Sequence, residues 1–176
     1  MKSFNWSAFN HVTESEFTAV ISWIARMPLC QVANDDLVEA APIQSNRLRF
    51  ALELLENFDL VSKSQSHVAL SELGKTFAGA DESARRAFLG IKIMDLIPVS
   101  EIFHLLERSV GGRLSRRVVT EFFHESYGPR VAESDIEGFV RWAVACRLFA
   151  FDRKRNEIVW IRNETSPTSV QNGRAS

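Results

Sequence analysis

The sequence predicts a mainly α-helical chain with small β-hairpins, an α+β fold of the tandem winged helix-turn-helix type. Residues 34–80 carry, in order, the signals of a helix, a turn, a second helix, two short strands and another helix. The same order of helices followed by a strand pair recurs after residue 80. With 45% hydrophobic and 24% charged residues, the 176-residue chain has the composition of an ordinary globular protein.

The first half is predicted from caps and apolar spacing. Thr13 and Glu16 have the spacing of a capping box, and they predict a helix over 13–27 that Pro28 ends. Asn34 indicates a cap for a helix over 34–41, and Ser45 with Asn46 indicates a cap for a helix over 45–58. Two β-compatible runs over 60–70 predict a hairpin, and a helix over 71–79 follows.

The second half repeats this order without repeating the residues. A helical stretch begins at Ser83, Pro98 bends or breaks it, and a helix continues to residue 107. After a Gly111-Gly112 turn, Ser115 caps a helix that Gly128 ends, and a further helix starts at residue 133. The runs 148–151 and 157–161, joined by the polar segment 152–156, predict a second hairpin.

Charge and composition divide the chain into three parts. Residues 1–80 hold six Lys and Arg against nine Asp and Glu, a net charge of −3, whereas the remainder holds fifteen against thirteen, a net charge of +2. We therefore expect a first winged-helix unit over 1–80, a second over 81–162, and a disordered polar tail over 163–176. Phe4, Trp6 and Phe9, in the N-terminal aromatic segment of the first unit, could pack within the chain or dock a second subunit as a homodimer.

Several runs resemble one known family. They are Leu70-Ser71-Glu72-Leu73-Gly74-Lys75-Thr76-Phe77-Ala78, Asp81, Arg85-Arg86 with Phe88, Glu121-Phe122-Phe123, Phe139-Val140-Arg141-Trp142-Ala143 and Arg147-Leu148-Phe149-Ala150-Phe151-Asp152. These residues resemble the C-terminal AAA-associated domain, over roughly 29–160. In that family the domain usually follows the ATPase domain of transporters of the nitrate, sulfonate and taurine type.

The resemblance implies a partner protein and no catalytic residue. The chain lacks the complete pattern of a Gly-rich phosphate-binding loop ending in Lys-Ser or Lys-Thr. It would therefore be a free-standing version of the domain, and any partnership with an ATPase would occur in trans.

The first unit also carries a plausible DNA-reading surface. In a winged helix the third helix enters the major groove with its N-terminal residues nearest the bases, where amide side chains can pair with adenine and Arg with guanine. The candidate residues here are Gln44, Ser45, Asn46, Arg47 and Arg49, with Lys63 on the first hairpin. The alternative is a solvated helix start with Asn46 as its cap.

The corresponding helix of the second unit is acidic where the first is basic. Glu133, Asp135 and Glu137 would face phosphates, so we expect this helix to stay out of the groove. Arg153, Lys154 and Arg155 at the second hairpin tip could follow phosphates or a minor groove, or form a solvated turn.

The sequence gives little support for catalysis or for metal binding. The four histidines have no metal-motif spacing, no nucleophile elbow or dinucleotide pattern occurs, and we expect no enzyme activity, metal or cofactor. His104 is expected to be packed, and Cys30 and Cys146 to be buried free thiols. We find no signal peptide and no run long enough to span a membrane, so we expect a cytoplasmic protein.

Two functions follow. The first is a non-catalytic regulatory or interaction module that acts through a protein partner. The alternative is a DNA-binding transcriptional regulator that uses the first winged helix.

Overall fold

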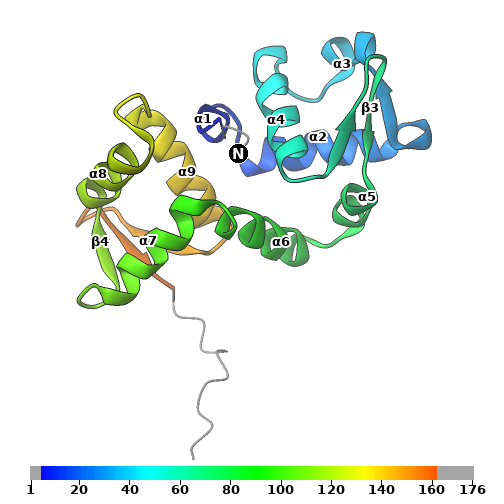
Figure 1. The fold of residues 1–176 in the computed structure, drawn as a ribbon. Helices are drawn as coiled ribbons and strands as arrows, with labels where there is room; N and C mark the ends of the chain where they lie inside the picture. The colour runs from blue at the N-terminus through cyan, green and yellow to red at the C-terminus, as the bar shows by residue number, and fades with distance from the viewer. Residues whose placement is uncertain (1–4, 162–176) are drawn as a thin grey trace, which may run out of the picture.

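The computed structural model describes residues 5–161, except for the side chains of residues 97 and 98 (Figure 1). It is mostly helical, with two small antiparallel sheets, as the sequence predicts. The predicted tail over 163–176 and Phe4 lie outside the described residues. The order of helices and hairpins agrees with the predicted order, while the assignment to the winged-helix class stays a prediction.

The first half begins with a five-residue helix that the sequence did not predict. Its elements are α1 (Ser7–His11), α2 (Glu14–Arg26), a short 3-10 turn (Pro28–Cys30), β1 (Gln31–Ala33), α3 (Asn34–Ala40), α4 (Ser45–Asn57), β2 (Val61–Lys63), β3 (His67–Leu70) and α5 (Glu72–Gly79). The predicted hairpin forms from β2 and β3, and β1 adds a third strand on the other side of β3.

The second half has the same arrangement. Its elements are α6 (Glu82–Met94), α7 (Ile97–Arg108), β4 (Arg113–Ser115), α8 (Arg116–Tyr127), α9 (Glu133–Ala145), β5 (Phe149–Asp152) and β6 (Glu157–Trp160). The predicted break at Pro98 is confirmed, because α7 begins beside it and proline suits the first turn of a helix. Gly111 and Gly112 take positive φ angles of 73° and 63° in the predicted turn. The strand β4 pairs with β6, which also pairs with β5.

The helix caps agree with the prediction at two sites and differ at two. The Thr13–Glu16 capping box is present, and Ser115 caps α8 by accepting a hydrogen bond from the amide of Val118 at 3.4 Å. Asn34 does not cap α3; its side chain instead donates to the carbonyls of Ser64 and Gln65 in the first hairpin, at 3.4 and 2.9 Å. Ser45 lies inside α4, whose cap position is Gln44 with no side-chain cap. Both helices therefore begin without the predicted side-chain caps.

Replacing Thr13 by Ala should lower the free energy of unfolding by about 1 kcal/mol, because the α2 amide of Glu16 loses its 3.1 Å acceptor. Urea denaturation measures the change. Thr76 is the matched control, since its hydroxyl bonds within exposed α5, and Thr76→Ala should change stability by no more than ~0.5 kcal/mol. Equal losses for the two variants would contradict this account of α2.

Two of the N-terminal aromatic residues, Trp6 and Phe9, pack within the chain. Trp6 and Phe9 are buried, and both rings contact Phe139 of α9, with centroids 5.8 and 5.9 Å away. The buried apolar residues of the two halves form one continuous cluster that includes α1. Figure 1 shows α1 between α9 and α4, and it contacts both. The division of the chain near residue 80 stays a prediction.

Candidate functional site

The start of α4 presents the predicted DNA-reading residues on the surface. Gln44, Ser45, Asn46, Arg47 and Arg49 are all exposed, as is Lys63 on β2. Their exposure has a simple cause: the apolar residues of α4 follow a helical period and turn the opposite face toward the core. The structure thus gathers the five candidates of 44–49 at the start of α4, whereas Lys63 lies beside Glu56 near the other end of that helix.

The cations of this surface already have partners. The Arg47 guanidinium lies 2.5 Å from a Glu16 carboxylate oxygen, and Lys63 Nζ lies 2.7 Å from Glu56. Arg49 lies over the Phe50 ring, 5.1 Å from its centroid. An incoming phosphate would therefore compete with Glu16 and Glu56, so the net positive field at this surface is weak.

The helix α1 and the residues around it cover part of the outer side of α4. The His11 ring stacks on Phe50 at 4.3 Å between centroids, and the Asn5 side-chain amide donates to Glu53 at 3.1 Å. Phe50 and Glu53 are neighbours on one face of α4, since residues three apart share a face. Between these elements lies a polar pocket of about 500 Å³, lined by Asn10, His11, Thr13, Gln44, Asn46, Arg47, Phe50 and Arg141.

The same short helix is fixed to α9 by backbone contacts. Arg141 donates to the carbonyls of Phe9 and Asn10 at 3.0 and 3.1 Å. The Trp142 indole N–H donates to the carbonyl of Val12 at 2.7 Å. Gly138 lets α1 approach closely, since a Cβ there would lie 2.5 Å from the Asn10 backbone. The helix α1 thus lies against both α4 and α9, which are the third helices of the two predicted winged helices.

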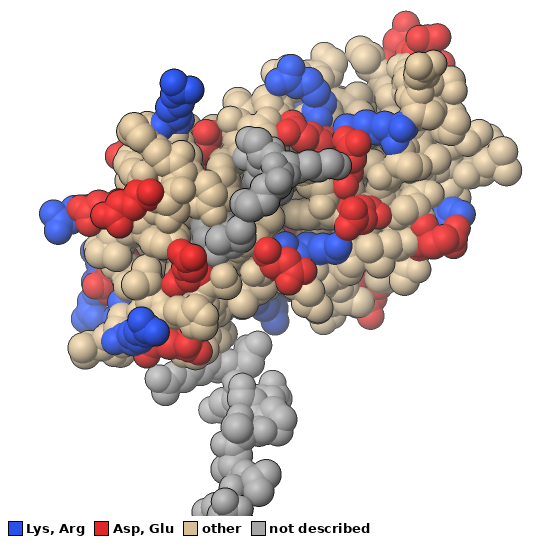
Figure 2. Space-filling view, in the orientation of Figure 1, with Lys and Arg blue, Asp and Glu red and all other residues tan. Residues whose placement is uncertain are grey.

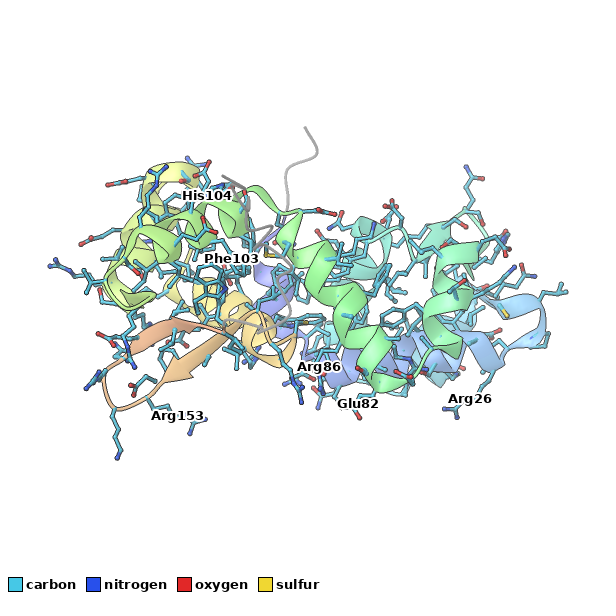
Figure 3. The ribbon with its side chains drawn as sticks, turned by 90° about the horizontal axis from the view of Figure 1, so that it is seen from below. Arg26, Glu82, Arg86, Phe103, His104 and Arg153 are labelled. Atoms are coloured by element: carbon cyan, nitrogen blue, oxygen red, sulfur yellow. The ribbon has the colours of Figure 1, made fainter. Side chains whose placement is uncertain are left out.

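A second face of α9 borders an apolar groove of about 550 Å³. The β5–β6 hairpin forms its other wall and α8 contributes to one end; its lining residues are Arg116, Val119, Ile136, Glu137, Val140, Arg141, Val144, Phe151, Arg153 and Ile158. Figure 3 labels Arg153 on the hairpin, with α9 beside it. We name this feature the α9 groove. Arg153 was a predicted contact residue, whereas the groove itself was not predicted.

At the tip of the hairpin, an acidic side chain organises the basic residues. The Asp152 carboxylate accepts from the amides of Arg155 and Lys154, at 3.3 and 3.1 Å, and from the Arg113 guanidinium at 3.3 Å. The Arg155 amide contributes most to lowering the pKa of Asp152 below its ordinary value of 3.8. The side chains of Arg153, Lys154 and Arg155 are exposed.

The lowered pKa gives a pH prediction for the hairpin. A carboxyl group whose pKa is lower in the folded state stabilises that state above its ordinary pKa of 3.8, and this contribution is lost as the pH falls through the lowered value. A carboxyl-carbon NMR titration should give Asp152 a midpoint below 3.8. Asp152→Asn should remove this resonance and the corresponding acid dependence of hairpin amide shifts. A midpoint at or above the ordinary value would contradict the hydrogen-bonding arrangement.

The predictions for His104 and Cys30 were wrong, and the prediction for Cys146 is confirmed. His104 is not packed; its side chain is 68% exposed and lies 3.3 Å from a Glu107 oxygen. Cys146 is buried, and burial raises the pKa of its thiol to about 12, whereas Cys30 is only half-buried. Among residues 5–161, no three His, Cys, Asp or Glu side chains lie close enough together to hold a metal ion.

Surface charge and helix length add two general observations. Figure 2 shows acidic and basic side chains interspersed on the face it presents, with no continuous field of one sign. No helix in the described part of the chain is long and apolar enough to cross a membrane.

Comparison with known families matches residues 35–152 to the C-terminal AAA-associated domain. No curated protein matches the chain. No solved structure matches it either. The matched region runs from the start of α3 to the end of β5, and it includes α4, α9 and most of the α9 groove. Since this match spans more than half of the sequence, the chain belongs to the C-terminal AAA-associated domain family.

Proposed function

We propose that this chain is a non-catalytic interaction module that binds an ATPase in trans and regulates or assembles it. Membership of a family of ATPase-associated domains supports a protein partner. The position of α1 is the observation that favours a protein partner over DNA. It lies between α4 and α9, so neither third helix stands alone at the surface (Figure 1).

The geometry of B-DNA explains why this position matters. A major groove about 12 Å wide admits one α-helix, which has a diameter of about 10–12 Å with its side chains. If α4 entered the groove along the face that carries Phe50 and Glu53, His11 and Asn5 would enter with it. Because the buried α1 residues belong to the core, α1 is not a detachable cover.

Affinity capture from the cells that make the protein tests the proposal. With the full chain as bait, we expect to recover an ATPase of the transporter type in amounts comparable to the bait, and chemical cross-linking should join the two proteins directly. A bait variant with a disrupted core, Trp142→Ala, serves as the control for non-specific capture. Recovery of no ATPase, or equal recovery with the control, would count against the proposal.

The DNA-binding alternative rests on the exposed α4 residues, and one measurement separates it. Fluorescence anisotropy with a random duplex pool at low salt should show no binding that depends on Arg47 or Arg49. If binding occurs and the double replacement Arg47→Ala, Arg49→Ala weakens it by ~1–3 kcal/mol per base-contacting residue, the DNA function replaces the one proposed.

A further inference from the structure

We propose that the α9 groove binds an acidic amphipathic helix of a protein partner. This inference rests on the proposed function and adds the chemistry of the partner segment. It is carried by three properties of the groove: its apolar wall, its length and its unbalanced positive charge.

The groove exposes apolar surface. Val119, Ile136 and Ile158 are buried at its floor, whereas Val140, Val144 and Phe151 are only half-buried along its sides. Covering these half-exposed side chains with apolar groups removes their surface from water, which is the main source of free energy in helix-in-groove binding.

The shape of the groove favours a short helix. Ile136, Val140 and Val144 lie four residues apart on α9 and form one straight row along it. A rise of 1.5 Å per residue makes this row ~12 Å long, which is the length of about two helical turns. An amphipathic helix that presents apolar residues three and four positions apart matches a row of this length.

The charge of the rim favours an acidic partner. Three arginines and one glutamate border the groove, and the glutamate, Glu137, is already paired with Arg116. Arg141 donates to two carbonyl groups, which leave its charge in place. Arg153 makes no ion pair with any residue in the described range 5–161, and its planar fork suits a carboxylate. The Arg153 guanidinium therefore remains available to a bound segment, while the charge of Arg141 adds to the positive field at the rim.

Neighbouring residues add to the positive charge at the rim of the groove. Lys154 and Arg155 follow Arg153 at the exposed hairpin tip, while the Asp152 carboxylate beside them is engaged by Arg113 and by two backbone amides. The apolar floor does not suit a nucleic acid duplex, whose phosphates need a solvated basic surface. A helix with apolar residues on one side and Asp or Glu at the edges of that side matches both the apolar floor and the basic rim of the groove.

A phage-displayed library of helical peptides tests the inference on the full chain. The peptides have about 14 residues, ~21 Å when helical, with Leu fixed at one helical face and the other positions randomised. We expect selection to enrich Asp and Glu at the positions that flank the leucines. The enriched peptide, measured by fluorescence anisotropy, should bind Arg153→Glu at least about tenfold more weakly than the unaltered chain.

A matched control comes from the other end of the molecule. Arg26 in the last turn of α2 lies far from Arg153 (Figure 3), so Arg26→Glu makes the same change of charge away from the groove and should leave binding unchanged. Both replacements are at exposed or partly exposed arginines, and circular dichroism should show the same helix content and thermal midpoint for each. In NMR spectra the peptide should shift the amides of Val140, Phe151 and Ile158.

The outcomes separate this inference from the proposed function. No enrichment, enrichment of Lys and Arg, equal weakening by the two charge reversals, or amide shifts outside the groove would each overturn the α9 groove as the binding site. If an ATPase is captured but its cross-links lie outside the α9 groove, the proposed function is supported and the groove is not its binding site. If selected acidic peptides bind the α9 groove but no ATPase is captured, the groove is supported as a helix-binding site and the proposed function is contradicted.

Discussion

Replacing Phe9 by Ala should lower the free energy of unfolding by about 3–5 kcal/mol, the range measured for deletion of a buried aromatic ring. Phe9 is fully buried, and its ring contacts Trp6, Phe139 and Trp142 with centroids 5.4 to 6.0 Å apart. A helix of five residues is too short to form alone, so α1 depends on this packing. Loss of the ring leaves a cavity between α1 and α9, because neighbouring aromatic rings close it only in part.

Chemical denaturation followed by tryptophan fluorescence measures this effect. Val110→Ala is the control, since Val110 is 97% exposed and its replacement should change stability by no more than about 0.5 kcal/mol. A loss at Phe9 below ~1 kcal/mol, with native circular dichroism, would show that α1 contributes little to the core.

Gly138→Ala should destabilise the protein by about 1–3 kcal/mol, although alanine favours a helix over glycine by about 1 kcal/mol. The new Cβ would lie 2.5 Å from both N and Cα of Asn10. These are backbone atoms of α1, so the clash cannot be relieved by turning a side chain. The methyl group must push α1 away from α9, which strains the hydrogen bonds of Arg141 and Trp142 to the α1 segment.

Gly79→Ala is the matched replacement, because Gly79 also lies in a helix but has no atom within 4 Å of the new Cβ. It should be neutral or slightly stabilising, by up to ~1 kcal/mol. Gly138→Ala should therefore lower thermal stability, whereas Gly79→Ala should leave it unchanged or raise it slightly. If Gly138→Ala is as stable as Gly79→Ala, then α1 does not approach α9 as closely as described.

Local signals in the sequence predict the helices well, and long-range pairing explains what they miss. The Thr13 capping box, Pro98 and Gly128 mark helix boundaries through contacts within a few residues, and the structure has boundaries at all three. The strands β1 and β4 have three residues each, too few for a period, and they form by pairing with Val68 and Ile158 far along the chain. The helix α1 forms for the same reason, since its stability comes from α9.

The candidate site was only partly predictable. Sequence reasoning identified the exposed residues of α4, but their partners Glu16 and Glu56 lie on α2 and at the end of α4, where spacing alone does not pair them with Arg47 and Lys63. The α9 groove gave no separate signal in the sequence. Ile136, Phe139, Val140, Ala143 and Val144 have the spacing of a single apolar face, so the sequence does not show that this face is divided between two neighbours. Phe139 faces α1, and Val140 faces the groove.

Amide hydrogen exchange of the full chain, read by mass spectrometry, tests the central claim that α1 is fixed between the third helices of both halves. The account predicts that the Ala8–Val12 amides exchange as slowly as those of α9, because α1 opens only when the shared core opens. Rapid exchange of these amides, at the rate of an unstructured N-terminus, with α4 and α9 still protected, would contradict it. In that case α4 would be free to enter a DNA groove.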